Sequence, residues 1–351
     1  MIFEMAKEYG CEQIVFCNDE ASGLKAIIVM HDSTFGPAAG GTRLHDYPSE
    51  EEALTDAFRL AQGMTRKTAM AKSRVGGAKA VIMSKPENKT EAMLRAYGRY
   101  VERLNGAFIT GNDVNITFED SKIIAEETKY VLGATDKLGS SGPVTAHGVF
   151  HGMRACVKEV YGTPSMAGLK IAIQGMGAVG SCLAKELHEV GAELIVCDIN
   201  EEAVARAAEE FGATVVAVNE IYSVDADIFA PCAMGAIIND KTIPQFKFKI
   251  IAGCANNQLA TYAHGDELHK RGILYAPDYV VNAGGAIYVR VEMTQPDATP
   301  ETLLKEAEII EETMAEVIAT SKKNIESTHT TADKIADERV RREKIRKAGL
   351  G

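Results

Sequence analysis

The feature that most constrains the fold is a glycine-rich turn directly after a short apolar run. Residues 170–174 (KIAIQ) are typical of a buried strand, and residues 175–180 (GMGAVG) match Gly-x-Gly-x-x-Gly and lead into a segment with helical periodicity. Gly175 permits a tight turn, Gly177 lets the backbone approach a ligand, and Gly180 lets the helix lie close to the strand. The context predicts a dinucleotide-binding unit within a doubly wound sheet.

The residues around this turn predict which dinucleotide is bound. A diphosphate would lie at the positive end of the helix, against the loop residues Gly175, Met176, Gly177, Ala178, Val179 and Gly180. Asp198 ends the next predicted strand, where a carboxylate hydrogen-bonds to the hydroxyl groups of the adenosine ribose. Because that carboxylate would repel a 2′-phosphate, and the neighbouring Asn200 carries no positive charge, the sequence predicts NAD rather than NADP.

Strands and helices alternate through the rest of the chain, which predicts an α/β fold with a parallel sheet covered on both faces. The glycine- and serine-rich residues 139–143 (GSSGP) resemble a hinge. We expect strands at 13–17, 24–30, 75–83, 170–174, 194–198, 228–232, 250–255 and 274–277, and helices at 49–63, 90–104, 144–161, 179–190, 201–211 and 301–322, with a polar helical remainder.

The 351 residues predict two domains. The first is an N-terminal α/β domain of residues 1–136, onto which residues of about 322–351 pack back. The second is a doubly wound Rossmann domain of residues 137–321 that binds the dinucleotide.

Charge and composition exclude several classes of function. The net charge of −11 is spread along the chain, so a nucleic acid partner is not expected. A basic run at residues 339–347 (RVRREKIRK) opposes this, and we interpret it as a solvated helix end or a subunit contact. No stretch approaches the ~20 apolar residues of a membrane span, and the N-terminus is not a secretion signal.

The distribution of cysteine and histidine predicts no metal site. Seven scattered cysteines without a CxxC pair suit reduced thiols in the cytoplasm. The spacing of four histidines suggests no metal ligation, and they are interpreted as structural: His147, His151, His264 and His269.

Several short motifs concentrate polar groups in apolar surroundings. In the first domain they are residues 36–43 (GPAAGGTR), 63–67 (GMTRK), 76–79 (GGAK) and 111–114 (GNDV). With 175–180, 230–233 (APCA), 254–259 (CANNQL) and 276–285 (APDYVVNAGG), they resemble, over nearly the whole chain, the glutamate/leucine/phenylalanine/valine dehydrogenase family. The nearest branch is the small, leucine-dehydrogenase-like one. The resemblance implies an active site in the cleft between the domains, and homo-oligomers, from dimers to octamers, formed by the first domain.

The resemblance also implies an activity, the NAD-dependent, reversible oxidative deamination of a hydrophobic L-amino acid to the 2-oxo acid and ammonia. Lys67 would pair with the substrate carboxylate, Lys79 would be the base that activates the attacking water, and Asp113 would hold the amino group and transfer protons. A lysine acts as a base near neutral pH only if its pKa falls well below ~10.4, and burial and a second cation, here Lys67, both lower it.

In the second domain, the resemblance assigns residues to the cofactor and to the substrate. Thr145, Cys232 and Asn256 would lie along the cofactor, the first and last at its nicotinamide end. Asn257 and Asn282 would lie close to the substrate. A buried asparagine that only satisfies backbone groups remains the alternative.

The side-chain pocket of leucine dehydrogenases is lined by residues that match Ala39, Gly40, Met64, Gly111, Ala286 and Val289. Ala39, Gly111 and Ala286 are smaller here than in leucine enzymes, and residues 109–117 (ITGNDVNIT) resemble the tryptophan- and phenylalanine-using members. The hypothesis is therefore that long aliphatic or aromatic side chains are accepted. No charged residue occupies these positions, which disfavours glutamate.

Two departures from the family pattern and two alternatives remain. Ala78 and Asn115 stand where glycine is common, and both are small enough to be tolerated. An amine dehydrogenase without carboxylate recognition would not need Lys67. A catalytically silent, regulatory NAD-binding protein would not need Lys67, Lys79 and Asp113 together.

Overall fold

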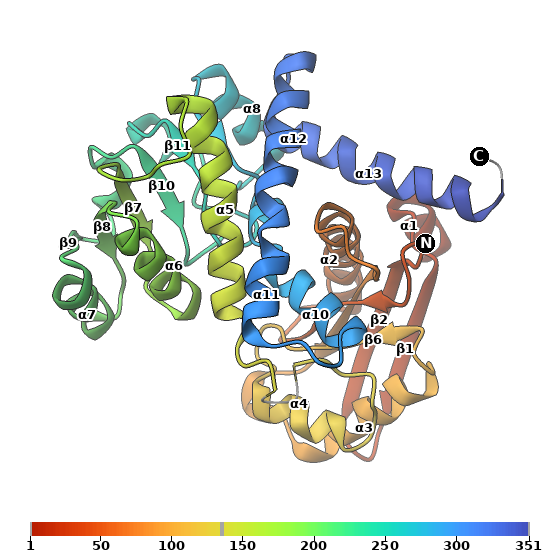
Figure 1. The fold of residues 1–351 in the computed structure, drawn as a ribbon. Helices are drawn as coiled ribbons and strands as arrows, with labels where there is room; N and C mark the ends of the chain where they lie inside the picture. The colour runs from red at the N-terminus through yellow and green to blue at the C-terminus, as the bar shows by residue number, and fades with distance from the viewer. Residues whose placement is uncertain (1, 134–136, 350–351) are drawn as a thin grey trace. The chain divides into compact units, whose positions relative to one another are not determined.

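The structure, a computed structural model, describes residues 2–133 and 137–349, which form two compact units (Figure 1). Of these residues, unit 1 comprises 2–133, 137–140, 289–297 and 336–349, and unit 2 comprises 141–288 and 298–335. The units and the predicted domains divide the C-terminal part of the chain differently. Residues 289–297 belong to unit 1 because Val289 and Met293 pack on the apolar cluster of Ala39, Val75 and Ile109. The predicted boundary after residue 136 falls at residues 134–136, outside the described ranges.

Unit 1 contains a mixed sheet in the order β1-β2-β5-β3-β6, with β4 also paired to β5. β1, β2 and β5 are antiparallel, whereas β3 and β4 run parallel to β5, and β6 runs parallel to β3. The strands are β1 (Gln13–Asp19), β2 (Leu24–Asp32), β3 (Ala38–Ala39), β4 (Thr42–His45), β5 (Gly76–Met83) and β6 (Phe108–Ile109).

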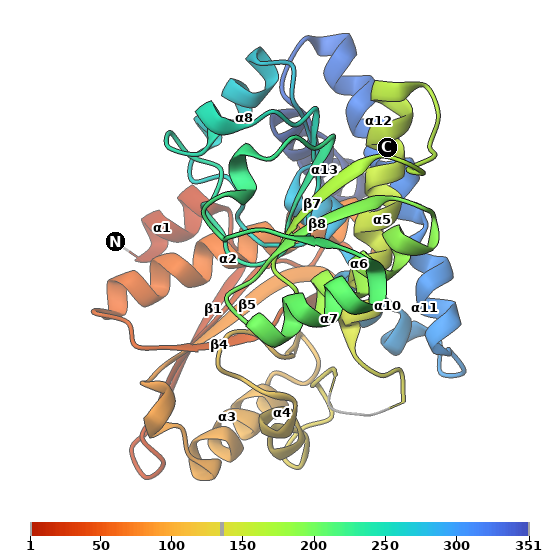
Figure 2. The same cartoon turned by 90° about the vertical axis from the view of Figure 1, so that its left-hand side faces the viewer.

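Both faces of this sheet are covered because β2 has apolar side chains on both of its faces. Ile27 and Val29 pack with Phe58 of α2, whereas Ile28 packs with Tyr97 of α3. Figure 2 shows α3 and α4 side by side on the second face. The helices are α1 (Ile2–Tyr9), α2 (Glu50–Met70), α3 (Glu91–Arg103) and α4 (Phe118–Ala125), with a 3₁₀ turn, η1 (Pro86–Asn88).

Helix α2 begins as predicted and ends later than predicted. Its N-cap Ser49 accepts a hydrogen bond from the backbone of Glu52. The predicted end was near residue 63, but Thr68, Ala69 and Met70 are buried, and this burial favours two further turns. Residues 65–67 therefore lie within the helix.

Unit 2 contains a parallel sheet in the order β9-β8-β7-β10-β11-β12. Numbered along the chain from β7, this is the order 3-2-1-4-5-6 of the dinucleotide-binding fold, which confirms the predicted Rossmann domain. The strands are β7 (Lys170–Gln174), β8 (Glu193–Cys197), β9 (Thr214–Val215), β10 (Ile228–Pro231), β11 (Ile250–Ile251) and β12 (Leu274–Tyr275).

The helices of unit 2 include a closely packed group in which α5 and α12 lie side by side (Figures 1 and 2). Gly148 of α5 permits this packing, because a Cβ there would lie 2.5 Å from Cδ1 of Ile310 on α12. The predicted helix 301–322 is two helices that meet at Glu308. The helices are α5 (Ser141–Tyr161), α6 (Ala178–Glu189), α7 (Glu201–Phe211), α8 (Tyr262–Lys270), α9 (Asp278–Val281), α11 (Pro300–Ala307) and α12 (Ile309–Asn324), with 3₁₀ turns η2 (Ile221–Ser223) and η3 (Ile243–Gln245).

Two helices, α10 (Gly284–Thr294) and α13 (Thr328–Lys347), each contribute residues to both units. In α13 the basic run makes contacts within unit 1. Arg341 and Arg342 pair with Glu338, and Nζ of Lys344 lies 2.6 Å from Oδ2 of the buried Asp32. The basic run, which the sequence analysis interprets as a solvated helix end or a subunit contact, therefore forms ion pairs within the chain. None of the described helices is long and apolar enough to cross a membrane.

Candidate active site

The glycine loop of unit 2 has the backbone geometry that its glycines permit. Gly175 has φ +103°, and its N–H donates to the carbonyl of Cys197 at 2.8 Å. A Cβ on Gly180 would lie 2.0 Å from the carbonyl oxygen of Gly175, so the helix can lie against the loop only with glycine there. At Gly177 a Cβ would meet nothing within 4 Å, and the residue is exposed. The open face of the loop is therefore at Gly177.

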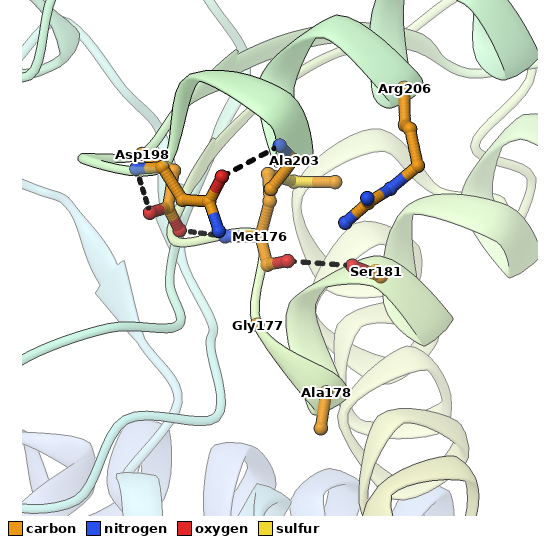
Figure 3. Close-up of a pocket in the computed structure, with 8 residues that line it drawn as sticks. Met176, Gly177, Ala178, Ser181, Asp198, Ala203 and Arg206 are labelled. Carbon is orange, nitrogen blue, oxygen red and sulfur yellow. Dashed lines mark hydrogen bonds between the residues drawn. The ribbon is translucent and has the colours of Figure 1, made fainter.

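A pocket opens beside this loop (Figure 3). The Asp198 carboxylate is held in place, since Oδ2 accepts from Met176 N at 2.6 Å and Oδ1 from Asn200 N at 2.8 Å. Gly177 is the N-cap of α6 and provides no side-chain cap, so the first amides of the helix remain available to an anion. The pocket is lined by Met176, Gly177, Ala178, Ser181, Asp198, Asn200, Ala203 and Arg206.

Arg206 is a residue of this pocket that the sequence prediction missed. Its side chain extends from α7 into the pocket that contains Asp198 (Figure 3). Asn200, which the prediction considered instead, caps α7 by accepting from the backbone of Ala203 at 3.2 Å. A signal was available, because Arg206 lies on the predicted helix 201–211, which begins soon after Asp198. The pocket thus contains a cation as well as a carboxylate.

In unit 1, two of the predicted catalytic residues form an ion pair. Nζ of Lys79, on β5, lies 3.0 Å from Oδ1 of Asp113, and the Lys79 side chain is only 7% exposed. Nε of Arg43, on β4, lies 3.0 Å from the other carboxylate oxygen of Asp113. Each oxygen of Asp113 therefore faces one cation.

The environment shifts the pKa values of this pair. Burial lowers the pKa of Lys79 below its ordinary value, although the nearby carboxylate of Asp113 opposes the shift. Burial alone would raise the pKa of Asp113, but the charges of Lys79 and Arg43 outweigh it, and the pKa is lowered. The arrangement holds Asp113 ionised and makes Lys79 easier to deprotonate.

A second carboxylate extends the network, and the sequence prediction missed it. Arg43 Nη1 lies 3.1 Å from Oδ2 of Asp56, and the same oxygen accepts a 2.6 Å hydrogen bond from the Tyr47 hydroxyl. Asp56 is on α2 and Tyr47 follows β4, so nothing local in the sequence links them to Lys79. The network fixes Arg43 against Asp113.

Glycines bring the elements of this network close together. A Cβ on Gly77 would lie 2.1 Å from Oγ1 of Thr65, so β5 touches α2 two residues before Lys67. A Cβ on Gly41 would lie 2.4 Å from the carbonyl oxygen of Asn112 and 3.1 Å from Cβ of Asp113. These contacts place β4, β5 and the segment after β6 at one point.

The backbone accommodates Ala78 and Asn115, the two residues that stand where the family commonly has glycine. Ala78 is fully buried on β5, beside Gly40. Asn115 has φ +60°, in the left-handed region that favours glycine and next tolerates asparagine. Its side chain also donates to the carbonyl of Leu44 at 3.0 Å.

The remaining predicted residues of unit 1 lie on several of its elements. Lys67 is half-buried in the last turn of α2, and Met64 lies one turn earlier on the same helix. Ala39 and Val289 belong to one apolar cluster. A Cβ on Gly111 would meet only the carbonyl oxygen of Leu132, at 3.5 Å, which is an ordinary contact.

In unit 2, the structure brings two predicted asparagines together. The buried Asn282 donates from Nδ2 to the carbonyl of Cys254 at 3.0 Å and to Oδ1 of Asn256 at 2.9 Å. Oδ1 of Asn282 is buried without a hydrogen-bond partner among the described residues. An asparagine whose only role is to bond to backbone groups would not leave this oxygen unpaired. Asn257 has φ +52° and is exposed.

The other predicted residues of unit 2 lie on separate elements. Thr145, in the first turn of α5, donates to the carbonyl of Ser141 at 2.8 Å. The Cys232 N–H donates to the carbonyl of Gln174 at 2.7 Å, next to the glycine loop. Ala286 is buried on α10.

Known proteins share both units. Residues 11–137 match the family described as Glu/Leu/Phe/Val dehydrogenase, dimerisation domain, and residues 196–348 match Glutamate/Leucine/Phenylalanine/Valine dehydrogenase. A leucine dehydrogenase of Bacillus cereus is 54% identical over 343 residues, which are 97% of this chain and 93% of the relative.

Other relatives carry different names. An L-tryptophan dehydrogenase of Nostoc punctiforme is 47% identical over 349 residues, 99% of this chain and 98% of the relative. The crystal structure of an L-tryptophan dehydrogenase from that organism superposes with a TM-score of 0.88, at 46% identity over 98% of this chain and 99% of the other. The chain therefore belongs to the glutamate/leucine/phenylalanine/valine dehydrogenase family and is an amino acid dehydrogenase.

Proposed function

We propose that this protein catalyses the NAD-dependent, reversible oxidative deamination of a hydrophobic L-amino acid. The observation that carries the proposal is the ion pair of the buried Lys79 with the half-buried Asp113, whose second oxygen faces Arg43. A lysine whose pKa is lowered by burial, held beside an ionised carboxylate, provides both a base and a proton carrier. Relatives at about half identity carry the names of leucine and tryptophan dehydrogenases.

The residues of unit 1 would act in sequence on the substrate. Lys67 would pair with the substrate carboxylate, and Asp113 would take a proton from the substrate ammonium group. Loss of hydride from Cα, which NAD would accept when bound, would then leave an iminium ion. Neutral Lys79 then takes a proton from water as the water oxygen bonds to the iminium carbon. Asp113 would return the proton that it took from the substrate to the amino group, and it would accept the hydroxyl proton as the carbon–nitrogen bond breaks, so that ammonia and the 2-oxo acid leave.

The proposed cofactor is NAD, held by the glycine loop of unit 2. Its diphosphate would lie on the amides at the start of α6, and Asp198 would accept from the ribose hydroxyl groups. Thr145 and Asn256 are proposed to contact its nicotinamide end, and Cys232 is proposed to lie along the cofactor. The Asp198 carboxylate disfavours a 2′-phosphate, whereas Arg206 in the same pocket opposes that preference.

The proposed substrates have long aliphatic or aromatic side chains. The resemblance assigns the substrate side chain to Ala39, Gly40, Met64, Gly111, Ala286 and Val289, and it assigns Asn257 and Asn282 to substrate binding. Gly111 and Ala39 leave room that larger residues would fill, and no charged group stands among the pocket residues.

The test is reduction of NAD and of NADP, measured at alkaline pH with leucine, valine, isoleucine, methionine, phenylalanine, tryptophan and glutamate. We expect activity with hydrophobic substrates, a preference for NAD, and loss of activity in Lys79→Ala. The wide-pocket hypothesis fails if kcat/KM for phenylalanine and tryptophan is at least tenfold below that for leucine. Activity on the matching amines but on no amino acid would instead identify an amine dehydrogenase, and silence on both would favour a regulatory protein.

We also propose that the protein is a homo-oligomer. Residues 11–137 match a dimerisation domain, and they form most of unit 1. Light scattering after size-exclusion chromatography measures the mass directly, and a 37.8 kDa particle would refute the proposal.

A further inference from the structure

A cluster of ionisable side chains in unit 2 comprises residues that have no part in the proposed function. His147 and His151 are four residues apart on α5, so both project from one face of that helix. Glu308, between α11 and α12, completes the cluster. One candidate ligand atom from each of the three side chains lies within 4.8 Å of the others. The sequence prediction judged that the spacing of these histidines suggests no metal ligation and interpreted both as structural residues.

The two imidazoles are oriented by carboxylates on neighbouring helices. Nδ1 of His147 lies 2.9 Å from Oε2 of Glu186 on α6, and Nδ1 of His151 lies 2.7 Å from Oε2 of Glu311 on α12. A carboxylate beside Nδ1 favours the tautomer with its proton there, which leaves the lone pair of Nε2 for a metal ion. Carboxylate–histidine pairs of this kind are typical of zinc sites.

We propose that His147, His151 and Glu308 bind a divalent zinc ion. Two imidazoles and one carboxylate form a three-residue ligand set that zinc accepts, with water in the fourth position. All three side chains are partly exposed, which leaves a route for the ion and the water. Metal–ligand bonds of ~2.0–2.1 Å in a tetrahedron need donor atoms about 3.4 Å apart, so modest side-chain rotations suffice.

The site would connect helices that are far apart in the chain. α5 contributes both histidines, and the junction of α11 and α12 contributes Glu308, with Glu186 and Glu311 behind them. Zinc would compete with Lys305, whose Nζ lies 2.6 Å from Oε2 of Glu308. Because Lys305 is largely exposed, its ammonium group can move into solvent at small cost. Bound zinc would therefore stabilise the packing of α5 against α11 and α12.

The first measurement is zinc affinity, with untagged protein that has been treated with chelator and dialysed. Competition with a chromophoric zinc chelator gives stoichiometry and Kd. We expect one zinc ion per chain, a Kd at least ~100-fold weaker in His147→Gln, His151→Gln and Glu308→Gln, and about tenfold weaker in Glu311→Gln. His188→Gln, which removes an exposed histidine of α6, is the matched control and should bind as tightly as the parent.

The second measurement excludes the seven cysteines as ligands. Cobalt bound at the proposed site should give a visible spectrum without a thiolate-to-cobalt charge-transfer band, and zinc should raise Tm of the parent and not of His151→Gln. Circular dichroism in chelator establishes that each variant is folded. A charge-transfer band, or equal zinc affinity in the folded ligand variants and the parent, would overturn the proposal. So would an absence of stoichiometric binding.

Discussion

The proposed cofactor pocket of unit 2 and the charged network of unit 1 are built in opposite ways. The pocket comes from residues 176–206, and backbone groups and a glycine loop dominate it. The network joins side chains from distant segments: Arg43, Asp56, Lys79 and Asp113. Local sequence therefore determines the first site. The second is assembled only by the sheet that joins β4 to β5 and, through β3, to β6, and by α2 packed on that sheet.

The largest expected effect tests whether the two sites are separable. Asp113→Asn removes the carboxylate that faces Lys79 and Arg43, so kcat should fall by roughly 10²-fold or more, as for other lost proton-transfer groups. Steady-state kinetics measures this fall, and NADH fluorescence should give an unchanged Kd because the cofactor is proposed to bind unit 2. Asp46→Asn, an exposed aspartate 4.0 Å from Lys85, is the control. A parallel rise in the NADH Kd would contradict the separation.

The next effect contrasts two glycines of one loop. Gly180→Ala puts a Cβ 2.0 Å from a backbone oxygen, so it should lower the free energy of unfolding by about 1–3 kcal/mol. Gly177→Ala places its methyl group in open space and should change stability by less than about 0.5 kcal/mol. That methyl group lies where the diphosphate is proposed to approach, so the NADH Kd should rise about tenfold, or ~1.4 kcal/mol. Urea denaturation and NADH titration measure the two effects, and similar stability loss in both variants would refute the contrast.

A smaller effect concerns the two charges of the cofactor pocket. Asp198→Asn should reduce the preference for NADH over NADPH by about tenfold, since the repulsion of the 2′-phosphate is removed. Adding Arg206→Ala should reverse part of the gain in NADPH affinity if the guanidinium contributes to binding the phosphate. Titrations of both cofactors measure the ratio. An unchanged ratio in Asp198→Asn would remove the basis for proposing NAD.

The smallest effect is a shift of a pH profile. A base must be neutral to act, so kcat/KM should rise with pH through the pKa of Lys79, which burial lowers below the ordinary ~10.4. The negative charge of Asp56 raises that pKa, so Asp56→Asn should move the inflection to lower pH by less than about one unit. Profiles of kcat/KM, with Asp46→Asn beside them, measure it. A shift to higher pH would mean that Asp56 acts by a different route.

The elements that the sequence predicted most closely are those followed by a glycine that ends them. β7 and α7 match the predicted residues 170–174 and 201–211, and α7 ends at Gly212 with φ +63°. The strands β3, β4 and β6 were missed because two to four residues show no periodicity and form only by pairing with distant partners. α10 was missed because Gly284 and Gly285 at its start argue against a helix.

By itself the sequence determined the glycine loop, the parallel alternation of unit 2, and the family, because these depend on contiguous residues. Lys79 and Asp113 were singled out by their motifs, but their 3.0 Å contact, and the roles of Arg43, Asp56 and Tyr47, came only from the tertiary structure. The same is true of His147, His151 and Glu308. A side-chain network is fixed by packing between segments, and electrostatic coupling depends on distances and burial that no local pattern encodes.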